Sequence, residues 1–124
     1  MLGKSDATPM IAVRDLDRAR KFYEEVLGLK TTYVSPEKDG MQWVEYDIGN
    51  GTLSIGAGAP GWKPTADGCS VGLEVDDFDV AIVHLRNKGV KFHMESFATP
   101  VCRMAFIYDP DGNAICIHKR NAGR

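Results

Sequence analysis

The sequence predicts an α+β fold in which two βαβββ modules pair to form a curved mixed sheet around a cavity, with the helices on the outer face. Three observations lead to this fold. Short runs of alternating apolar residues flank segments whose apolar residues have helical spacing. Residues that favour turns separate these runs. The whole pattern occurs twice, 62 residues apart.

The repeat is visible at both ends of the module. Thr8–Ala19 (TPMIAVRDLDRA) aligns with Ser70–Ala81 (SVGLEVDDFDVA), and Gly51–Gly56 (GTLSIG) aligns with Asn113–His118 (NAICIH). Both alignments have the same offset of 62 residues, and one offset that fits both ends favours duplication more than either match alone. The alternative is that short strand–turn–helix patterns resemble one another by chance.

The first module covers about residues 7–57 and begins with a strand at about 8–14. Asp15 follows the strand where a helix needs an N-cap, and Gly28 ends the helix because glycine tolerates a positive φ. Three more strands are expected at about 30–35, 41–48 and 52–57. Turns rich in Gly, Pro, Asp and Asn separate these strands.

The second module covers about residues 69–120 and repeats this order. Asp77 is the expected N-cap, and Gly89 ends the helix. The strands are expected at about 69–75, 90–96, 101–108 and 114–119, and the sequence DPDGN makes the turn before the last one. Gly and Pro in the stretch 58–68 indicate a linker between the modules.

Composition indicates a globular protein of the cytoplasm. The 124 residues are 44% hydrophobic and 26% charged, which suits one domain of ordinary size. No apolar run is long enough to span a membrane, and the first residues have no apolar signal core. Three cysteines cannot all pair within one chain, which favours reduced thiols. Lys and Arg are spread out and the net charge is −2, so no nucleic-acid partner is expected.

Two stretches resemble the vicinal-oxygen-chelate superfamily. They are VRDLDRARKFYEEVLGL (Val13–Leu29) and DPDGNAICIH (Asp109–His118), and the resemblance extends over about residues 7–120. Members include glyoxalase I, fosfomycin-resistance enzymes, extradiol dioxygenases and bleomycin-resistance proteins. The resemblance implies a single glyoxalase/bleomycin-resistance-like domain over residues 1–124, a homodimer, and a cavity between the modules.

The resemblance also implies where the family's enzymes hold a divalent metal ion. His, Glu or Gln from the first and last strands of each module are the ligands, and the matching positions here are Thr8, Ser54, Ser70 and Cys116. Neutral hydroxyls and one thiol are poor ligands for a catalytic divalent ion. We therefore expect no metal and no cofactor, although His118 is close enough to Cys116 to leave an atypical site open.

Strand alternation predicts which side chains face the cavity. Extending the 62-residue offset to the middle strands places Gln42, Val44 and Tyr46 with Met104 and Phe106 on this face, and turns Trp43 toward a helix or a partner. Trp62 in the linker is expected either to cover a ligand or to fill a dimer interface. The candidate ligand-binding residues are Thr8, Met10, Gln42, Tyr46, Ser54, Trp62, Ser70, Met104, Phe106, Cys116 and His118.

This lining suits a flat or partly apolar small molecule, and the net charge favours a nearly neutral one. The alternative is that the same side chains fill a core or a dimer seam. Glu74 and His118 are the candidate catalytic residues, as a general base or a ligand anchor. The alternatives are that Glu74 pairs with Arg103 and that His118 is a solvated residue at a strand end. A buried, inert thiol is the expected state of Cys116.

The sequence therefore favours a metal-independent protein that binds a small organic molecule. The alternative is a lyase or isomerase of glyoxalase type, or a dioxygenase, with an atypical or absent metal site. A structural or regulatory dimer with a filled cavity is a third interpretation. The first two differ in whether a metal ion binds in stoichiometric amount.

Overall fold

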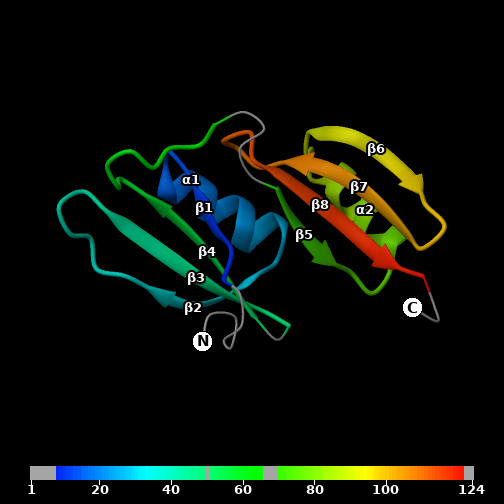
Figure 1. Ribbon diagram of the computed structural model, residues 1–124, viewed down its shortest axis with the longest axis horizontal. Coiled ribbons are helices and arrows are strands. Elements are labelled where there is room, and N and C mark those ends of the chain that lie inside the picture. Colours follow the sequence, from blue (N-terminus) through cyan, green and yellow to red (C-terminus); the bar gives the residue numbers. More distant parts are fainter. Residues whose placement is uncertain (1–7, 50, 66–69, 122–124) are drawn as a thin grey trace. The chain divides into compact units, whose positions relative to one another are not determined.

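The computed structural model describes residues 8–49, 51–65 and 70–121. The chain divides into two compact units, Met1–Pro64 and Thr65–Arg124. Each unit combines a four-stranded mixed sheet with a helical segment, so the α+β class and the doubled βαβββ order are confirmed (Figure 1). Cys69 and residues 66–68 of the expected linker lie outside the described residues.

The first unit has the strand order β1-β4-β3-β2. β1 runs parallel to β4, and the other neighbours are antiparallel. The elements are β1 (Met10–Ala12), α1 (Leu16–Arg20), the π-helical segment η1 (Lys21–Val26), β2 (Lys30–Val34), β3 (Gln42–Ile48) and β4 (Gly51–Ala57).

The second unit repeats this topology as β5-β8-β7-β6. Gly72 pairs with Cys116 as Met10 pairs with Ser54, so the offset of 62 residues is confirmed for the first and last strands. The elements are β5 (Ser70–Glu74), α2 (Phe78–Asn87), β6 (Phe92–Ala98), β7 (Cys102–Tyr108) and β8 (Ala114–Arg120).

The offset differs in the middle strands. Val44 pairs with Ile55, whereas Ala105 pairs with Ile117, so Val44 corresponds to Ala105 and the offset here is 61. Four residues connect the paired residues Asp47 and Thr52, whereas five connect the corresponding pair Tyr108 and Ala114, and this extra residue causes the difference. Because strand faces alternate with a period of two, one residue reverses the assignment. The prediction that Gln42, Val44 and Tyr46 share a face with Met104 and Phe106 was therefore wrong.

Both helices begin at the predicted N-caps. The Asp15 carboxylate accepts a hydrogen bond from the backbone N–H of Arg18 at 3.1 Å, and Asp77 accepts one from Val80 at the same distance. The first helix then widens into a π-helical segment, which the sequence analysis did not anticipate. This segment presents the Glu24 carboxylate to the Tyr46 hydroxyl at 2.8 Å.

The core of each unit lies between its helical segment and its sheet. Ile11, Leu53 and Ile55 are fully buried in the first unit, and Ile107 and Ile115 are fully buried in the second. Tyr46 is also fully buried, with its ring stacked on Tyr23 at 6.1 Å between centroids. Each helix therefore covers one face of its sheet, and the opposite face has no helix of the same unit against it.

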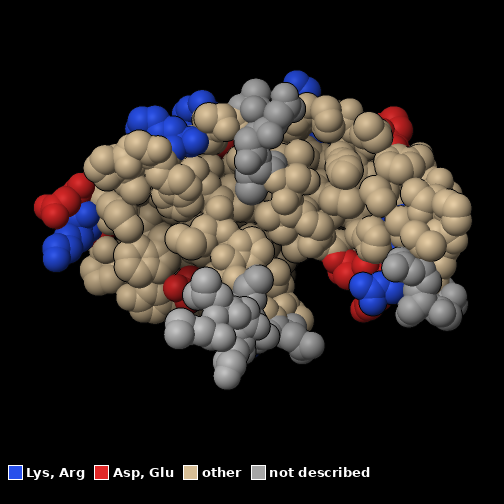
Figure 2. Space-filling model, in the orientation of Figure 1, with Lys and Arg blue, Asp and Glu red and all other residues tan. Residues whose placement is uncertain are grey.

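Charged side chains form no continuous basic surface on the face drawn in Figure 2. Lys and Arg occur there in small separate groups, as the sequence predicts. Within the described residues, no helix has the length and apolar character needed to cross a membrane.

Tyr46→Phe tests the revised face of β3. The substitution removes a hydroxyl that donates to Glu24 on the helix side, so we expect a loss of about 1 kcal/mol in the free energy of unfolding, measured by urea denaturation. Tyr33→Phe is the matched control, because Tyr33 is 45% exposed. Equal stability of the two variants would contradict the assignment.

Candidate functional site

A hollow of about 300 Å³ opens on the face of the first sheet that its helix does not cover. Its lining is rich in aromatic and thioether groups, with two hydroxyls and one carboxylate. The lining residues are Thr8, Met10, Met41, Trp43, Glu45, Ser54 and Trp62. The hollow therefore provides a concave, mainly apolar surface with a few polar groups.

Strand pairing brings the floor of the hollow together. Met10 of β1 pairs with Ser54 of β4, and Ser54 pairs on its other side with Glu45 of β3. Paired residues in a sheet point to the same face, so these three side chains form one row across three strands. Trp43 lies two residues before Glu45 on β3, so its side chain points to the same face of the sheet.

The loop after β4 holds Trp62 over this row. The Trp62 backbone N–H donates to the Ala59 carbonyl at 3.2 Å, and Arg14 donates to the carbonyl of the buried Pro64 at 3.4 Å. Gly58 has a φ of +92°, and a Cβ atom there would lie 1.9 Å from the carbonyl oxygen of Gly40. The loop thus approaches the β2–β3 connection too closely for any residue except glycine.

Gly56 of β4 makes room for the Trp62 ring. A Cβ atom at Gly56 would lie 2.8 Å from Cζ3 of Trp62 and 3.3 Å from Cβ of Trp43. Contacts under 3.0 Å are not tolerated, so the indole is packed directly on the strand backbone. The missing side chain of Gly56 therefore sets the position of Trp62 in the hollow.

Trp43 and Glu45 are linked to each other. The Trp43 indole Nε1–H donates to the Glu45 Oε2 at 3.2 Å. The Tyr33 ring lies 6.0 Å from the Trp43 ring between centroids, at a tilt of 44°. The hydrogen bond fixes both side chains of the pair on the floor of the hollow.

The structure brings together four of the predicted ligand-binding residues, Thr8, Met10, Ser54 and Trp62. Gln42 and Tyr46 are not among the residues that line the hollow. Gln42 donates to the Ser35 carbonyl at 2.9 Å, and Tyr46 is buried against the helix.

Sequence reasoning missed Met41, Trp43 and Glu45. Trp43 was expected to pack against a helix or a partner. The first alternative was wrong for the same one-residue reason, and the second stays a prediction. The signal that could have found Trp43 and Glu45 is the alternation of β3 itself. Val44 and Tyr46 are the apolar, fully buried positions, so the residues between them face away from the helix.

The remaining candidates share the uncovered face of the second sheet. Met104 pairs with His118, Phe106 pairs with Cys116, and Ser70 begins β5 on the same face. Burial raises the pKa of the Cys116 thiol, which agrees with an inert thiol.

Glu74 and His118, the two catalytic candidates, are in direct contact. Glu74 Oε1 lies 2.5 Å from His118 Nδ1, and Glu74 Oε2 accepts a hydrogen bond from the Arg120 backbone N–H at 2.7 Å. The Arg120 backbone hydrogen bond and the His118 side chain together lower the pKa of Glu74. The alternative that Glu74 pairs with Arg103 was wrong, because the Arg103 side chain instead donates to the Asp79 carboxylate at 2.8 Å.

The four positions that correspond to family metal ligands do not fit a divalent ion. Thr8 and Ser54 offer neutral hydroxyls, Ser70 offers another, and burial raises the pKa of the Cys116 thiol and so disfavours the thiolate that binds metals. Among residues 8–49, 51–65 and 70–121, no group of three or more His, Cys, Asp or Glu side chains could hold a metal ion.

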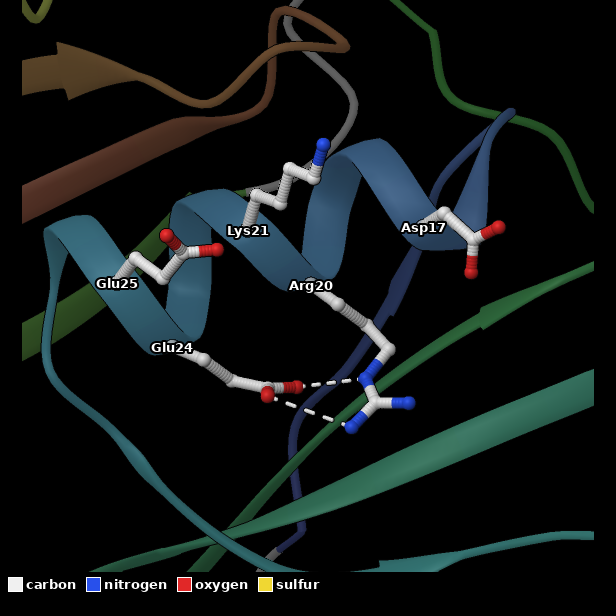
Figure 3. Close-up of a pocket in the computed structure, with 5 residues that line it drawn as sticks. All are labelled: Asp17, Arg20, Lys21, Glu24 and Glu25. Atoms are coloured by element: carbon white, nitrogen blue, oxygen red, sulfur yellow. Dashed lines mark hydrogen bonds and ion pairs between the residues drawn. The ribbon is translucent and has the colours of Figure 1, made fainter.

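A second hollow of about 360 Å³ lies on the outer surface of the first helix. Figure 3 shows Arg20 and Glu24 turned toward the sheet while Lys21 and Glu25 project from another side of the helix. Arg20 Nε donates to Glu24 at 2.7 Å. Burial raises the pKa of Glu24, but the hydrogen bonds from Arg20 and Tyr46 outweigh it and the net effect is a lowered pKa. This network ties the helix to the sheet, so its role is structural.

Comparison with protein families matches residues 7–117 to the Glyoxalase/Bleomycin resistance protein/Dioxygenase superfamily. Comparison with curated proteins gives no match.

Solved structures give several matches over nearly the whole chain. A glyoxalase/bleomycin resistance protein from Streptomyces sp. CB03234 is 28% identical, with 91% of this chain and 98% of that chain covered and a TM-score of 0.76. TnmS3, an antibiotic binding protein from the same organism, is 25% identical, with 98% and 99% covered and a TM-score of 0.82. The fosfomycin resistance protein FosX from Mesorhizobium loti is 19% identical, with 93% and 90% covered and a TM-score of 0.71, and it shares the fold.

Gly56→Ala tests the packing of Trp62. The added methyl group would displace the indole, so we expect a changed tryptophan emission maximum and a lower melting temperature. Gly72→Ala is the matched control, since Gly72 lies on a strand and a Cβ atom there meets nothing within 4 Å. An unchanged emission spectrum in Gly56→Ala would contradict the described contact.

Proposed function

Because the chain belongs to the glyoxalase/bleomycin resistance protein/dioxygenase superfamily, we propose that it is a metal-independent small-molecule-binding protein whose ligand is flat or partly apolar. The hollow on the first sheet carries this proposal. Both tryptophans of the chain, Trp43 and Trp62, line it together with two methionines. An antibiotic binding protein at 25% identity supports a binding role.

The chemistry of the hollow suits a planar ligand. Its volume of about 300 Å³ is at the lower end of small-molecule pockets, which range over roughly 300–1,000 Å³. Indole rings stack on flat rings, and Met10 and Met41 adapt to irregular apolar surfaces. Thr8 and Ser54 supply hydroxyls for hydrogen bonds. Ligand capture of this kind requires no bond to be made or broken.

The proposal also includes a cytoplasmic location and a homodimer. Cys102 and Cys116 are both buried free thiols, which suits the reducing cytoplasm. Exposed apolar side chains near the sheet edges, among them Tyr33, Met94 and Phe97, would be covered in a homodimer.

The second candidate function is a glyoxalase-type lyase or isomerase, or a dioxygenase, with an atypical or absent metal site. The contact between Glu74 and His118 favours the lyase or isomerase. A carboxylate on Nδ1 orients the imidazole and leaves Nε2 to exchange a proton with a substrate. The pair lies on the second sheet, whereas the residues that line the hollow belong to the first unit.

Ligand binding in the hollow should be visible in intrinsic fluorescence, because the chain has two tryptophans and both line it. We expect saturable quenching by at least one member of a panel of planar polycyclic compounds, and weaker quenching by non-planar apolar compounds of equal size. Trp62→Ala should weaken binding by roughly tenfold, measured by calorimetry, since it removes one stacking surface.

Phe97→Ala is the control for that measurement, because it removes an aromatic ring that is 39% exposed on β6. The proposal fails if no compound of the panel binds, or if Phe97→Ala weakens binding as much as Trp62→Ala.

Metal independence is tested by elemental mass spectrometry. The protein would be exposed to nickel, zinc, manganese and ferrous ions, dialysed, and compared with a metal-free sample by thermal shift. We expect far less than one bound ion per chain and an unchanged melting temperature, because the candidate ligands are hydroxyls and a neutral thiol. Close to one ion per chain with clear stabilisation would favour the enzymatic alternative.

A further inference from the structure

We infer that the hollow selects its ligand by charge: it takes a flat aromatic molecule that carries one positively charged nitrogen, and Glu45 is the residue that determines this preference. The inference rests on the proposed function and names its ligand class. It differs from the expectation drawn from the whole sequence, where a net charge of −2 favoured a nearly neutral ligand.

Glu45 is the one residue with a full charge among the seven that line the hollow. None of the seven is Lys or Arg, so no cation in the lining compensates the carboxylate. An ion within a concave, partly apolar surface interacts with a bound ligand more strongly than an ion in bulk water, because the effective dielectric is lower. The hollow therefore attracts cations and repels anions.

The position of the carboxylate is fixed. Trp43 Nε1–H donates to Oε2 at 3.2 Å, and Glu45 pairs with Ser54 on β4 and with Tyr33 on β2. Within the described residues, Oε1 has no hydrogen-bond partner. One carboxylate oxygen is thus held by the protein, and the other remains available to accept a hydrogen bond from a ligand.

The indole rings, like the Glu45 carboxylate, favour a positively charged ligand. The faces of Trp43 and Trp62 carry the negative part of the ring quadrupole, which attracts cations. A delocalised aromatic cation would stack on the rings and place its positive charge near Glu45.

A neutral apolar ligand would bind less well for a separate reason. It would cover the Glu45 carboxylate and remove water from Oε1 without replacing the hydrogen bond, and an unsatisfied charged acceptor is costly. An anion would add repulsion to this cost. The expected order of affinity is therefore cation, then neutral molecule, then anion.

Three probes of similar three-ring size test this order at pH 8: protonated 9-aminoacridine as the cation with N–H donors, acridine as the neutral molecule, and anthracene-9-carboxylate as the anion. Binding would be measured by calorimetry on the full chain, with tryptophan quenching as a second readout. We expect the cation to bind about tenfold more tightly than acridine, and this preference to decrease with rising salt concentration.

Glu45→Gln should remove the preference while leaving acridine affinity within about twofold, because glutamine keeps an acceptor for the Trp43 N–H. Glu45→Asp keeps the charge and should retain part of the preference. Glu25→Gln is the matched control, because it removes one negative charge from the same unit outside this hollow. It should keep the full preference.

The outcomes separate the inference from the proposed function. Equal affinity for the cation and acridine in the unmodified protein would overturn the inference and leave the proposed function standing. An equal loss of all three probes in Glu45→Gln would show that Glu45 only supports the fold of the hollow, and this too would overturn the inference. If no probe binds or quenches, the proposed function fails as well.

Discussion

The pairing of Val44 with Ile55 decides what the first sheet can do. Both side chains are fully buried under the helix, and this contact fixes the face of every other residue on β3. Trp43 and Glu45 are thereby turned to the open face, where they meet Ser54 and Trp62. A hydrophobic contact in the core thus determines the chemistry on the opposite side of the sheet.

Much of the fold could be predicted from the sequence because local signals agree with one another. The N-caps Asp15 and Asp77 and the alternation of β4 and β8 all have short-range causes, and all are observed. The site was harder to predict. The face of β3 was predicted by transferring the 62-residue offset from β7, and one extra residue in the β7–β8 connection makes that transfer fail. Trp62 is held by a loop whose close approach to Gly40 leaves no pattern in the sequence.

The net charge of the whole chain does not indicate the charge inside the hollow. A net charge of −2 is unremarkable, yet one carboxylate stands without a cation among aromatic and thioether groups. The two units share a topology but carry different side chains on their uncovered faces: indoles in the first, and the Glu74–His118 pair in the second. Fold similarity to antibiotic binding and fosfomycin resistance proteins therefore constrains the scaffold more than the chemistry.

Gly56 limits which substitutions this protein can accept during evolution. Every amino acid other than glycine would add the Cβ atom that collides with Trp62, so this position cannot vary while the indole stays in place. Met10, which is 63% exposed, and Met41, which is 37% exposed, border the same hollow without such a restriction. New ligand preferences would therefore arise at the two methionines, while Gly56 and Trp62 would be inherited together as one unit.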